Sequence, residues 1–575
     1  MNHPVAIVVV AFVGISCAFS PARADFVPAD AAEPRYEISL TASQDLSDWL
    51  AAQNPARTEI TGGGTIVVSG AYTLSVSTDA LAGFTGDVYI CKGTRVKTSV
   101  ANPLGTTEGK VVVENGATLN TTWADVNTPV NFGNKPVYIA GKGTDNKGAI
   151  YVTPLTGNKV SGHPGEVYLT DDALAGCSMQ TRISGNVHLE GHTFTSDYSG
   201  GWTYWMQDFY DSTGNGNVIV AREILLENRQ PNFKFGGPAN TLTYRNGAGF
   251  RTNNYTQNQA NPWTMVMEAG SYFYCGGGTS TWYGDVVLGS GPHQLRHQNF
   301  WAIQRYYGKI TGPGGIGKSN NQQTEKIELH GAENDFVGGV YLTCNVLTLG
   351  CNGALPAAGG PLTNVNSTVM FGSATDFYDL PEAYFSGTGN VVATSAAFRP
   401  QGVWRRQIVK DGEGVLNYNA LIGSPKLEVK GGSIKFPVAA ASDALPVFTN
   451  VQVRAGASVT FGAGFTGFWA VPRLMNGGGE IRGSVTAEGF AVDPACAEEP
   501  LTVTGALAFT EDACLEVPET LSHETSKTYT LATAATITGR PRAQNSSWHA
   551  EIVSTPDGRQ SLRIAYTDGF TIIVR

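Results

Sequence analysis

Two imidazoles and a carboxylate stand at alternate positions in one short segment, at His188, Glu190 and His192. On an extended strand these three side chains would point the same way, and such a set can hold zinc or a similar ion. The intervening Val187 and Leu189 are apolar, however, and this alternation is typical of a strand with one buried and one solvated face. We therefore expect the polar trio to face solvent, and the sequence predicts neither a metal nor an organic cofactor.

Aromatic residues gather between positions 197 and 307, where they are interleaved with glycine, serine and asparagine. Exposed rings can stack on sugars, and charged side chains beside them can bind sugar hydroxyls. The rings predicted to bind glycan are Trp202, Tyr204, Trp205, Trp282 and Tyr283, and the charged residues near the aromatic stretch are Asp208, Asp211, Asp285, Arg296 and His297. The alternative is that the rings form an aromatic core inside wide coils.

A third pattern, Gly312-Pro313-Gly314-Gly315-Ile316-Gly317-Lys318-Ser319, satisfies G-x-x-x-x-G-K-[ST], the phosphate-binding loop of nucleotide hydrolases. That loop works only between a buried strand and a helix, whose N-terminal amides hold the phosphates. Here Ser319 is followed by Asn320-Asn321-Gln322-Gln323 and then by an alternating strand. The sequence therefore predicts a tight glycine turn between strands and no nucleotide site.

Groups that could support polysaccharide cleavage do not form an ordered set. A glycoside hydrolase needs two carboxylates on opposite sides of the scissile bond, and Asp171-Asp172 stands alone. A lyase needs a strong base beside cations, for which Arg296-His297 is thin support. We assign no catalytic residues, and a polysaccharide lyase or glycoside hydrolase is the alternative function.

The chain begins with the features of a secretory signal peptide over residues 1–24. A short apolar run from Ala6 to Val13 precedes Ala22-Arg23-Ala24, a small-x-small cleavage site. No later segment is apolar and long enough to cross a membrane as a helix. We expect the mature chain to start near Asp25 and to be exported, to the medium or the cell surface.

Composition favours many short strands joined by glycine and asparagine turns. Glycine accounts for 70 of 575 residues and only 15% of residues are charged, whereas about 7% and about 25% are usual. The net charge of −10 argues against nucleic acid as a partner. Seven cysteines follow the predicted signal peptide, and we expect isolated thiols rather than bonds within the two closest pairs, Cys344–Cys351 and Cys496–Cys514.

Helical periodicity is clear only over residues 43–52, where a serine cap and early acids precede Leu46, Trp49 and Leu50. A short helix there would cover the open end of the first rung of a β-helix and prevent edge pairing. Short strands then follow at intervals of 8–12 residues, beginning with Thr65-Ile66-Val67-Val68.

One stretch, residues 312–371, carries a recognisable repeat. Its elements are Gly312, Gly314, Gly315, Ile316 and Lys318, then Ile327-Glu328-Leu329, then Gly331, Asn334, Phe336, Gly338 and Gly339, then Val346-Leu347-Thr348-Leu349, Ala354-Leu355-Pro356, Gly359-Gly360 and Leu362. A degenerate second copy covers residues 410–446, from Lys410 to Asp443-Ala444-Leu445-Pro446. These segments resemble the autotransporter-associated β-strand repeat of bacterial surface proteins. Lys318 and Lys410 are 92 residues apart, which indicates an insertion in the first copy or a diverged copy between them rather than a regular period.

The resemblance implies an all-β fold: a right-handed parallel β-helix, or solenoid, with a short N-terminal capping helix and a small C-terminal β cap. The expected organisation is a signal peptide over 1–24, an N-terminal cap region over 25–60, a β-helix over 61–476, and C-terminal coils with a β cap over 477–575. The implied function is that of an exported, non-catalytic rod acting as adhesin, spacer or glycan-binding protein. Its expected partner is an extracellular polysaccharide or a host or cell-surface glycan.

Overall fold

A computed structural model describes residues 34–567 apart from short gaps. The gaps are 101, 124–134, 155–165, 178–180, 185, 199–202, 207–208, 223, 227–234, 237–239, 253–262, 276–278, 298–302, 320–325, 373–375, 395–400, 439 and 441. The predicted signal peptide and Trp202 therefore lie outside the described residues.

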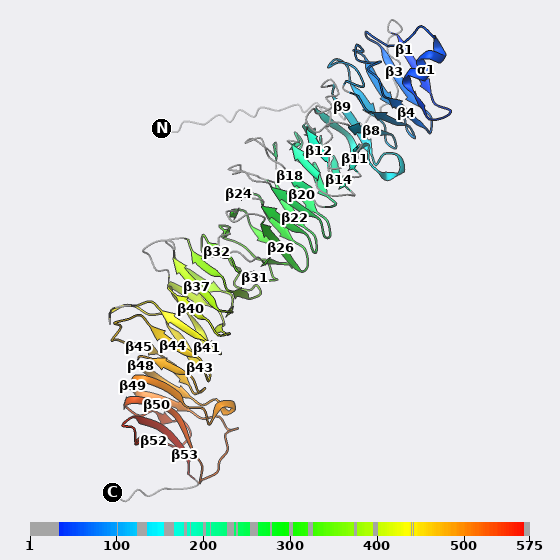
Figure 1. Ribbon diagram of the computed structural model, residues 1–575. Helices are drawn as coiled ribbons and strands as arrows, with labels where there is room; N and C mark the ends of the chain where they lie inside the picture. Colours follow the sequence, from blue (N-terminus) through cyan, green and yellow to red (C-terminus); the bar gives the residue numbers. More distant parts are fainter. Residues whose placement is uncertain are drawn as a thin grey trace, which may run out of the picture.

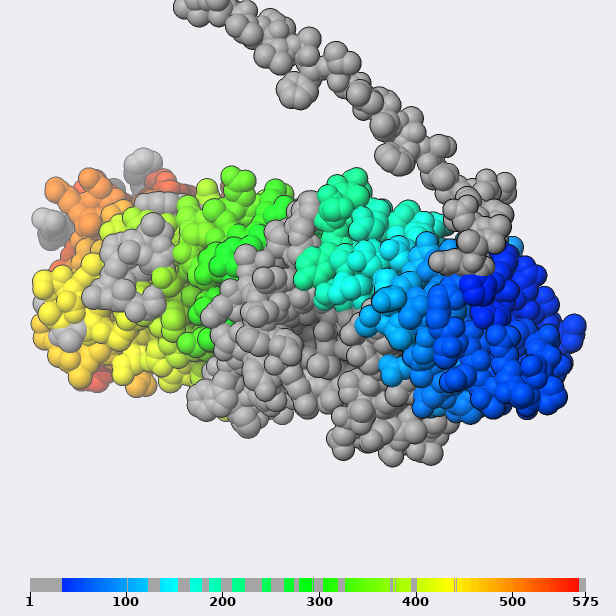
Figure 2. Space-filling model, turned by 90° about the horizontal axis from the view of Figure 1, so that it is seen from above, coloured from blue at the N-terminus to red at the C-terminus, as the bar shows by residue number. Residues whose placement is uncertain are grey.

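The chain winds into a parallel β-solenoid (Figure 1). Strand β1 (Arg35–Ser39) pairs in parallel with β3 (Thr65–Ser69), which pairs in parallel with β5 (Asp87–Ile90) on the next rung. Seen from above, the colours run in sequence order along the rod, from blue at one end to yellow and red at the other (Figure 2). The predicted all-β parallel solenoid is confirmed, with 53% strand and 3% helix.

Helix α1 (Leu46–Gln53) lies at the N-terminal end of the rod, as predicted. The predicted serine cap is wrong, because the helix begins later: the Asp45 carboxylate caps it by accepting a hydrogen bond from the Ser47 amide at 3.0 Å. Leu46 and Leu50 are fully buried, and the helix packs on β2 (Gln44–Asp45) and β4 (Thr73–Val76). The apolar face of α1 thus covers the side chains of the first rungs.

Alternation along each short strand produces the core. In β5, Val88 and Ile90 are buried, whereas Asp87 and Tyr89 are only half-buried. Because neighbouring strands pair in register, the inward residues of successive rungs form one continuous apolar interior. The outward residues form columns along the flank of the rod in the same way, and these columns bring together side chains that are distant in sequence.

The two repeat copies lie on the same column, four rungs apart. The strands concerned are β29 (Gly315–Ser319), β31 (Val340–Thr343), β33 (Leu362–Val365), β36 (Ala383–Ser386) and β39 (Gln407–Lys410). In register, Lys318 is followed by Leu342, Asn364, Phe385 and Lys410. The 92-residue spacing is therefore four turns of the solenoid.

Strand β29 also decides the meaning of the G-x-x-x-x-G-K-[ST] pattern. The last five residues of the pattern form β29, which pairs in parallel with β31 and β26 (Pro292–His297). Lys318 is fully buried. The predicted glycine turn is therefore confined to Gly312–Gly314, and the rest of the pattern is a strand of the solenoid.

The C-terminal end changes from parallel to antiparallel pairing. Strand β50 (Thr528–Thr538) pairs in parallel with β49 (Leu501–Glu516) on one side and antiparallel with β53 (Gln560–Tyr566) on the other. Strand β52 (Trp548–Ser554) completes this antiparallel cap, in which Trp548 and Ile564 are buried. In the described part of the chain, no helix has the length and apolar character needed to span a bilayer.

Five described cysteine side chains carry free thiols: Cys91, Cys344, Cys351, Cys496 and Cys514. Neither of the two closest pairs is bonded, in agreement with the prediction of isolated thiols. The Cys275 side chain lies outside the described residues.

Candidate functional site

An exposed aromatic column, which we call the Tyr283 stack, comprises Tyr283, Tyr307 and His330. Each residue directly follows a strand, and these strands lie on successive rungs: β24 (Thr279–Trp282), β27 (Ile303–Tyr306) and β30 (Lys326–Leu329). The Tyr283 and Tyr307 ring centroids are 4.8 Å apart, and those of Tyr307 and His330 are 4.5 Å apart, with interplanar angles of 11° and 8°. Tyr283 is 48% exposed and Tyr307 is 40% exposed. The parallel register of the rungs thus builds a flat-ring stack on the flank of the rod.

A glycine ends the stack on the next rung. Gly350 follows β32 (Val346–Leu349), which pairs in register with β30. A Cβ atom at this position would lie 2.1 Å from Nδ1 of His330. The backbone of Gly350 therefore makes room for the imidazole, which lies between the Tyr307 ring and the next rung.

Charged pairs flank the Tyr283 stack. Arg305 Nε donates to Glu328 Oε2 at 2.7 Å, and His330 Nε2 lies 3.3 Å from the same oxygen. Burial opposes ionisation of Glu328, but hydrogen bonds from His330 and Arg305 and the positive charge of Arg305 outweigh it and lower its pKa. On the turn side, Lys309 Nζ lies 2.7 Å from Asp335 Oδ2. Rings and ionised groups together suit a ligand with apolar faces and hydroxyl edges.

The predicted glycan-binding residues have different outcomes. Trp282 belongs to the hydrophobic core and is 3% exposed, so its ring has no free face for a sugar. Tyr283, the next residue, lies on the surface of the rod. The Tyr204 and Trp205 backbones lie in β15 (Thr203–Met206), but their side chains and all of Trp202 are outside the described residues. For Trp282 the correct interpretation is the aromatic core.

Sequence reasoning missed His330 as a member of the stack, because it singled out the neighbouring Gly331 of the repeat and gave the histidine no role. The signal that could have found it is spacing. Tyr283, Tyr307 and His330 are separated by 24 and 23 residues, which matches one rung of this solenoid.

A second column of rings occupies the N-terminal half and comprises Tyr138, Tyr168, His188 and Tyr210. The strands that carry it are β9 (Val137–Gly141), β11 (Val167–Cys177), β13 (Val187–His188) and β16 (Phe209–Tyr210), paired in register. Successive centroids are 5.0, 4.3 and 5.4 Å apart, and all three pairs are stacked. These rings are half-buried, so they offer less free surface than Tyr283 and Tyr307.

His188, Glu190 and His192 do not form one site. Strand β13 ends at His188, whose Nε2 contacts the Glu166 carboxylate within the ring column. Glu190 has φ +49° in the following turn, and its carboxylate accepts a hydrogen bond from Ser212 Oγ at 3.2 Å. The expectation of a shared orientation required a longer strand and is wrong.

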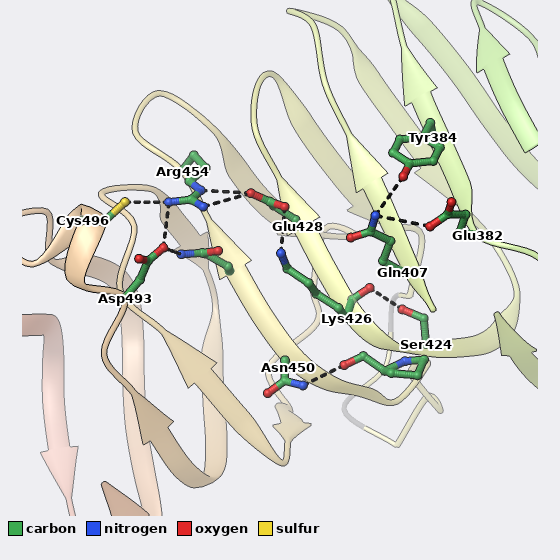
Figure 3. A network of polar contacts seen from close by, with 12 residues as sticks. Glu382, Tyr384, Gln407, Ser424, Lys426, Glu428, Asn450, Arg454, Asp493 and Cys496 are labelled. Carbon is green, nitrogen blue, oxygen red and sulfur yellow. Dashed lines mark hydrogen bonds and ion pairs between the residues drawn. The ribbon is translucent and has the colours of Figure 1, made fainter. Parts of the chain in front are cut away.

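Figure 3 shows a dense polar network in the C-terminal half, centred on Arg454. The guanidinium contacts Glu428 Oε1, Asp493 Oδ2 and Cys496 Sγ at 3.1, 3.1 and 2.6 Å. Lys426 Nζ lies 3.0 Å from the other Glu428 oxygen. The network joins β41 (Leu421–Val429), the residue after β43 (Phe448–Val453) and the short helix η2 (Pro494–Cys496).

The electrostatics of this network suit a clamp. Burial opposes ionisation of Glu428 and Asp493, but hydrogen bonds and neighbouring cations outweigh it, so both pKa values are lowered. Burial raises the pKa of the Cys496 thiol despite the Arg454 charge. A general acid or base works best with a pKa near the working pH, and a nucleophilic cysteine needs a lowered one. Glu428 and Asp493 therefore stay ionised and paired with cations, and the Cys496 thiol stays neutral.

Comparisons with known proteins give no family for the chain. No family model matches it, and a search of curated proteins returns no similar sequence. The functional argument therefore depends on the architecture and on the side chains along its flank.

Proposed function

We propose that the protein is an exported rod that binds glycan through the Tyr283 stack, in the manner of an autotransporter passenger-like adhesin. The parallel solenoid supports this proposal, as does the resemblance of residues 312–371 to the autotransporter-associated repeat. The observation that carries it is the exposure of Tyr283 and Tyr307 side by side, between charged pairs. The expected ligand is an extracellular polysaccharide or a cell-surface glycan.

The stacked geometry determines how a sugar would dock. Tyr307 has both faces covered, by Tyr283 and by His330, so it offers its edge and its hydroxyl. Tyr283 has one face on Tyr307, and within the described part of the chain no ring stacks on the other face. A sugar ring would therefore place its apolar face against Tyr283, while its hydroxyls reach the charged pairs beside the stack.

The test is binding to a glycan array, followed by titration of the best ligand against matched variants. Tyr283→Ala and Tyr307→Ala should each weaken binding about tenfold or more, as expected for the loss of an aromatic contact. Tyr72→Ala is the control, because Tyr72 is similarly exposed at 45% but directly precedes β4, which lies near the N-terminal end of the rod. If both stack variants bind the glycan with the affinity of the parent, the Tyr283 stack is not part of the binding site. Failure of the parent to bind any glycan on the array would contradict the proposed function.

A further inference from the structure

Three ligand-type side chains converge at one corner of the solenoid, away from the Tyr283 stack. Asp171, Asp172 and His192 each offer one ligand atom, and these atoms all lie within 4.8 Å of one another. Both carboxylates are exposed and the imidazole is half-buried. Because Asp171 and Asp172 belong to β11 and His192 precedes β14 (Thr193–Tyr198) on the next rung, the cluster bridges two rungs.

The backbone on both rungs departs from regular pairing at this corner. Strand β11 pairs with β9 up to Leu169 and resumes at Ala173, so Thr170, Asp171 and Asp172 lie opposite the single residue Ala140 at a bulge. Bulges of this kind re-aim side chains and are frequent beside functional sites. On the next rung, Glu190 and Gly191 both have positive φ and turn the chain so that His192 meets the bulge.

Backbone amides orient the two carboxylates. The Thr193 amide donates to Asp172 Oδ1 at 2.7 Å, and the Asp172 amide donates to Asp171 Oδ1 at 2.7 Å. Such bonds hold one oxygen of each carboxylate, as the outer hydrogen bonds of metal ligands do. Among the described residues, no lysine or arginine forms an ion pair with either carboxylate. Within the described residues, the corner therefore concentrates negative charge that no ion pair balances.

We propose that Asp171, Asp172 and His192 bind a divalent transition-metal ion, for which Zn²⁺ is the probe. Two carboxylate oxygens and one imidazole nitrogen form a mixed set that suits zinc, whereas Ca²⁺ and Mg²⁺ take oxygen ligands. Tetrahedral coordination with metal–ligand bonds of about 2.0–2.2 Å places ligand atoms about 3.3–3.6 Å apart. Small side-chain rotations would close the group to that size, and solvent would complete the coordination.

Bound metal would tie the bulge of β11 to the following rung. A ligand that binds only the folded protein stabilises it by mass action, so thermal unfolding should shift upward with Zn²⁺. This inference does not depend on glycan binding, since the Tyr283 stack is carried by strands from β24 onward and the corner by β11 and β14.

The experiment is calorimetric titration of the chelator-treated full chain with Zn²⁺, with the free thiols kept reduced. His192→Gln and Asp172→Asn should each weaken the site at least about tenfold, because even outer-partner changes cost about 10–100-fold. His549→Gln is the matched control, as His549 is an exposed histidine in the C-terminal cap. Circular dichroism checks that each variant folds.

The expected result is one Zn²⁺ site in the parent and in His549→Gln that is lost or weakened in both corner variants. If His192→Gln and the parent bind Zn²⁺ with the same affinity and stoichiometry, or if the parent binds none, the proposed site is wrong. The two substituted ligands lie on different rungs. If Asp172→Asn fails to fold, the Zn²⁺ affinity of His192→Gln alone therefore tests the proposed site.

Discussion

Buried lysines are unusual inside a β-solenoid, and here their ammonium groups satisfy backbone carbonyls at its corners. Lys135 and Lys410 are fully buried. Lys135 Nζ donates to Gly86 O at 2.5 Å, and Lys410 Nζ donates to the carbonyls of Asp411, Gly412 and Gly431 at 2.6, 2.8 and 3.3 Å. Burial lowers the pKa of both lysines although nearby carboxylates oppose the shift, and Lys135 falls to about 8.

Lys135→Met should change how stability depends on pH. The folded pKa of Lys135, about 8, lies below the ordinary 10.5. Between these values the unfolded chain keeps a proton that the folded chain releases, so the free energy of unfolding rises with pH. The gain over this window is at most about 3 kcal/mol, from about 1.4 kcal/mol per pKa unit.

Urea unfolding of the parent and of Lys135→Met at pH 7 to 10 measures this effect. The difference in unfolding free energy, parent minus variant, should increase with pH. Lys92→Met, at an exposed position on the flank, should give a flat difference. A flat difference for Lys135→Met as well would show that Lys135 keeps an ordinary pKa.

At the residue scale, the sequence was informative about residue types but not about strand phase. Trp282 and Tyr283 are neighbours and equally suited to sugar stacking, yet one ends the strand facing inward and the other begins the turn outside. Local alternation could not decide which ring was buried, because the strand is only four residues long. The rung-length spacing of Tyr283, Tyr307 and His330 was present in the sequence, but it has meaning only once the rungs are known.

At the element scale, the Arg454 network clamps adjacent coils near the C-terminal end. Its carboxylates come from β41 and from the residue before η2, and Gln452 in β43 donates to Asp493 Oδ2 at 2.7 Å. Glu428 and Gln452 are buried although they lie on the outward phase of their strands. Ion pairs and hydrogen bonds thus fasten the η2 segment to the flank of the rod.

Arg454→Met should destabilise the protein, because it leaves Glu428 and Asp493 without the guanidinium between them. We expect a loss of about 1–3 kcal/mol, less than for a fully buried pair, since the Arg454 side chain is 29% exposed. The folded pKa values of both carboxylates are lowered from 4.5 and 3.8, so their stabilisation is present above those values and is lost as pH falls below them.

The measurement is thermal unfolding of the parent and Arg454→Met from pH 7 to 3, with Arg406→Met as an exposed control. The gap between parent and Arg454→Met should narrow below about pH 4 as the carboxylates are protonated. Equal unfolding temperatures for parent and Arg454→Met at pH 7 would mean that the network contributes no stability.

The elements also show what sequence reasoning could reach. The N-terminal helix was predicted because 3.6-residue periodicity is local, although its cap is Asp45 and not the expected serine. The repeat copies were found because their glycine turns are local. The four rungs between Lys318 and Lys410 were not resolved, because turns of different length change the spacing from rung to rung while the strand pairing stays in register. The shared orientation expected for His188, Glu190 and His192 was wrong for a related reason. Strand β13 is only two residues long, and the turn after it reorients Glu190 and His192.

At the scale of the whole molecule, the stacked rungs make an elongated body (Figure 1). Both ends are covered, by α1 at one and by the antiparallel cap at the other, which prevents end-to-end strand pairing. Every side-chain column, including the Tyr283 stack and the Asp171 corner, depends on this one architecture.

The most direct test of that architecture counts rungs by pulsed electron spin resonance between two spin labels on one outward column. This column runs in register through Lys326, Val346, Thr368, Val391, Asn417, Lys435, Thr460 and Arg482. Labels attached through ketone-bearing residues avoid the native thiols. At ~4.8 Å per rung, the pair 326/417 should be about 19 Å apart and the pair 326/482 about 34 Å apart. Distances that do not grow with the number of rungs, or a 326/482 distance as short as the 326/417 distance, would contradict the parallel solenoid.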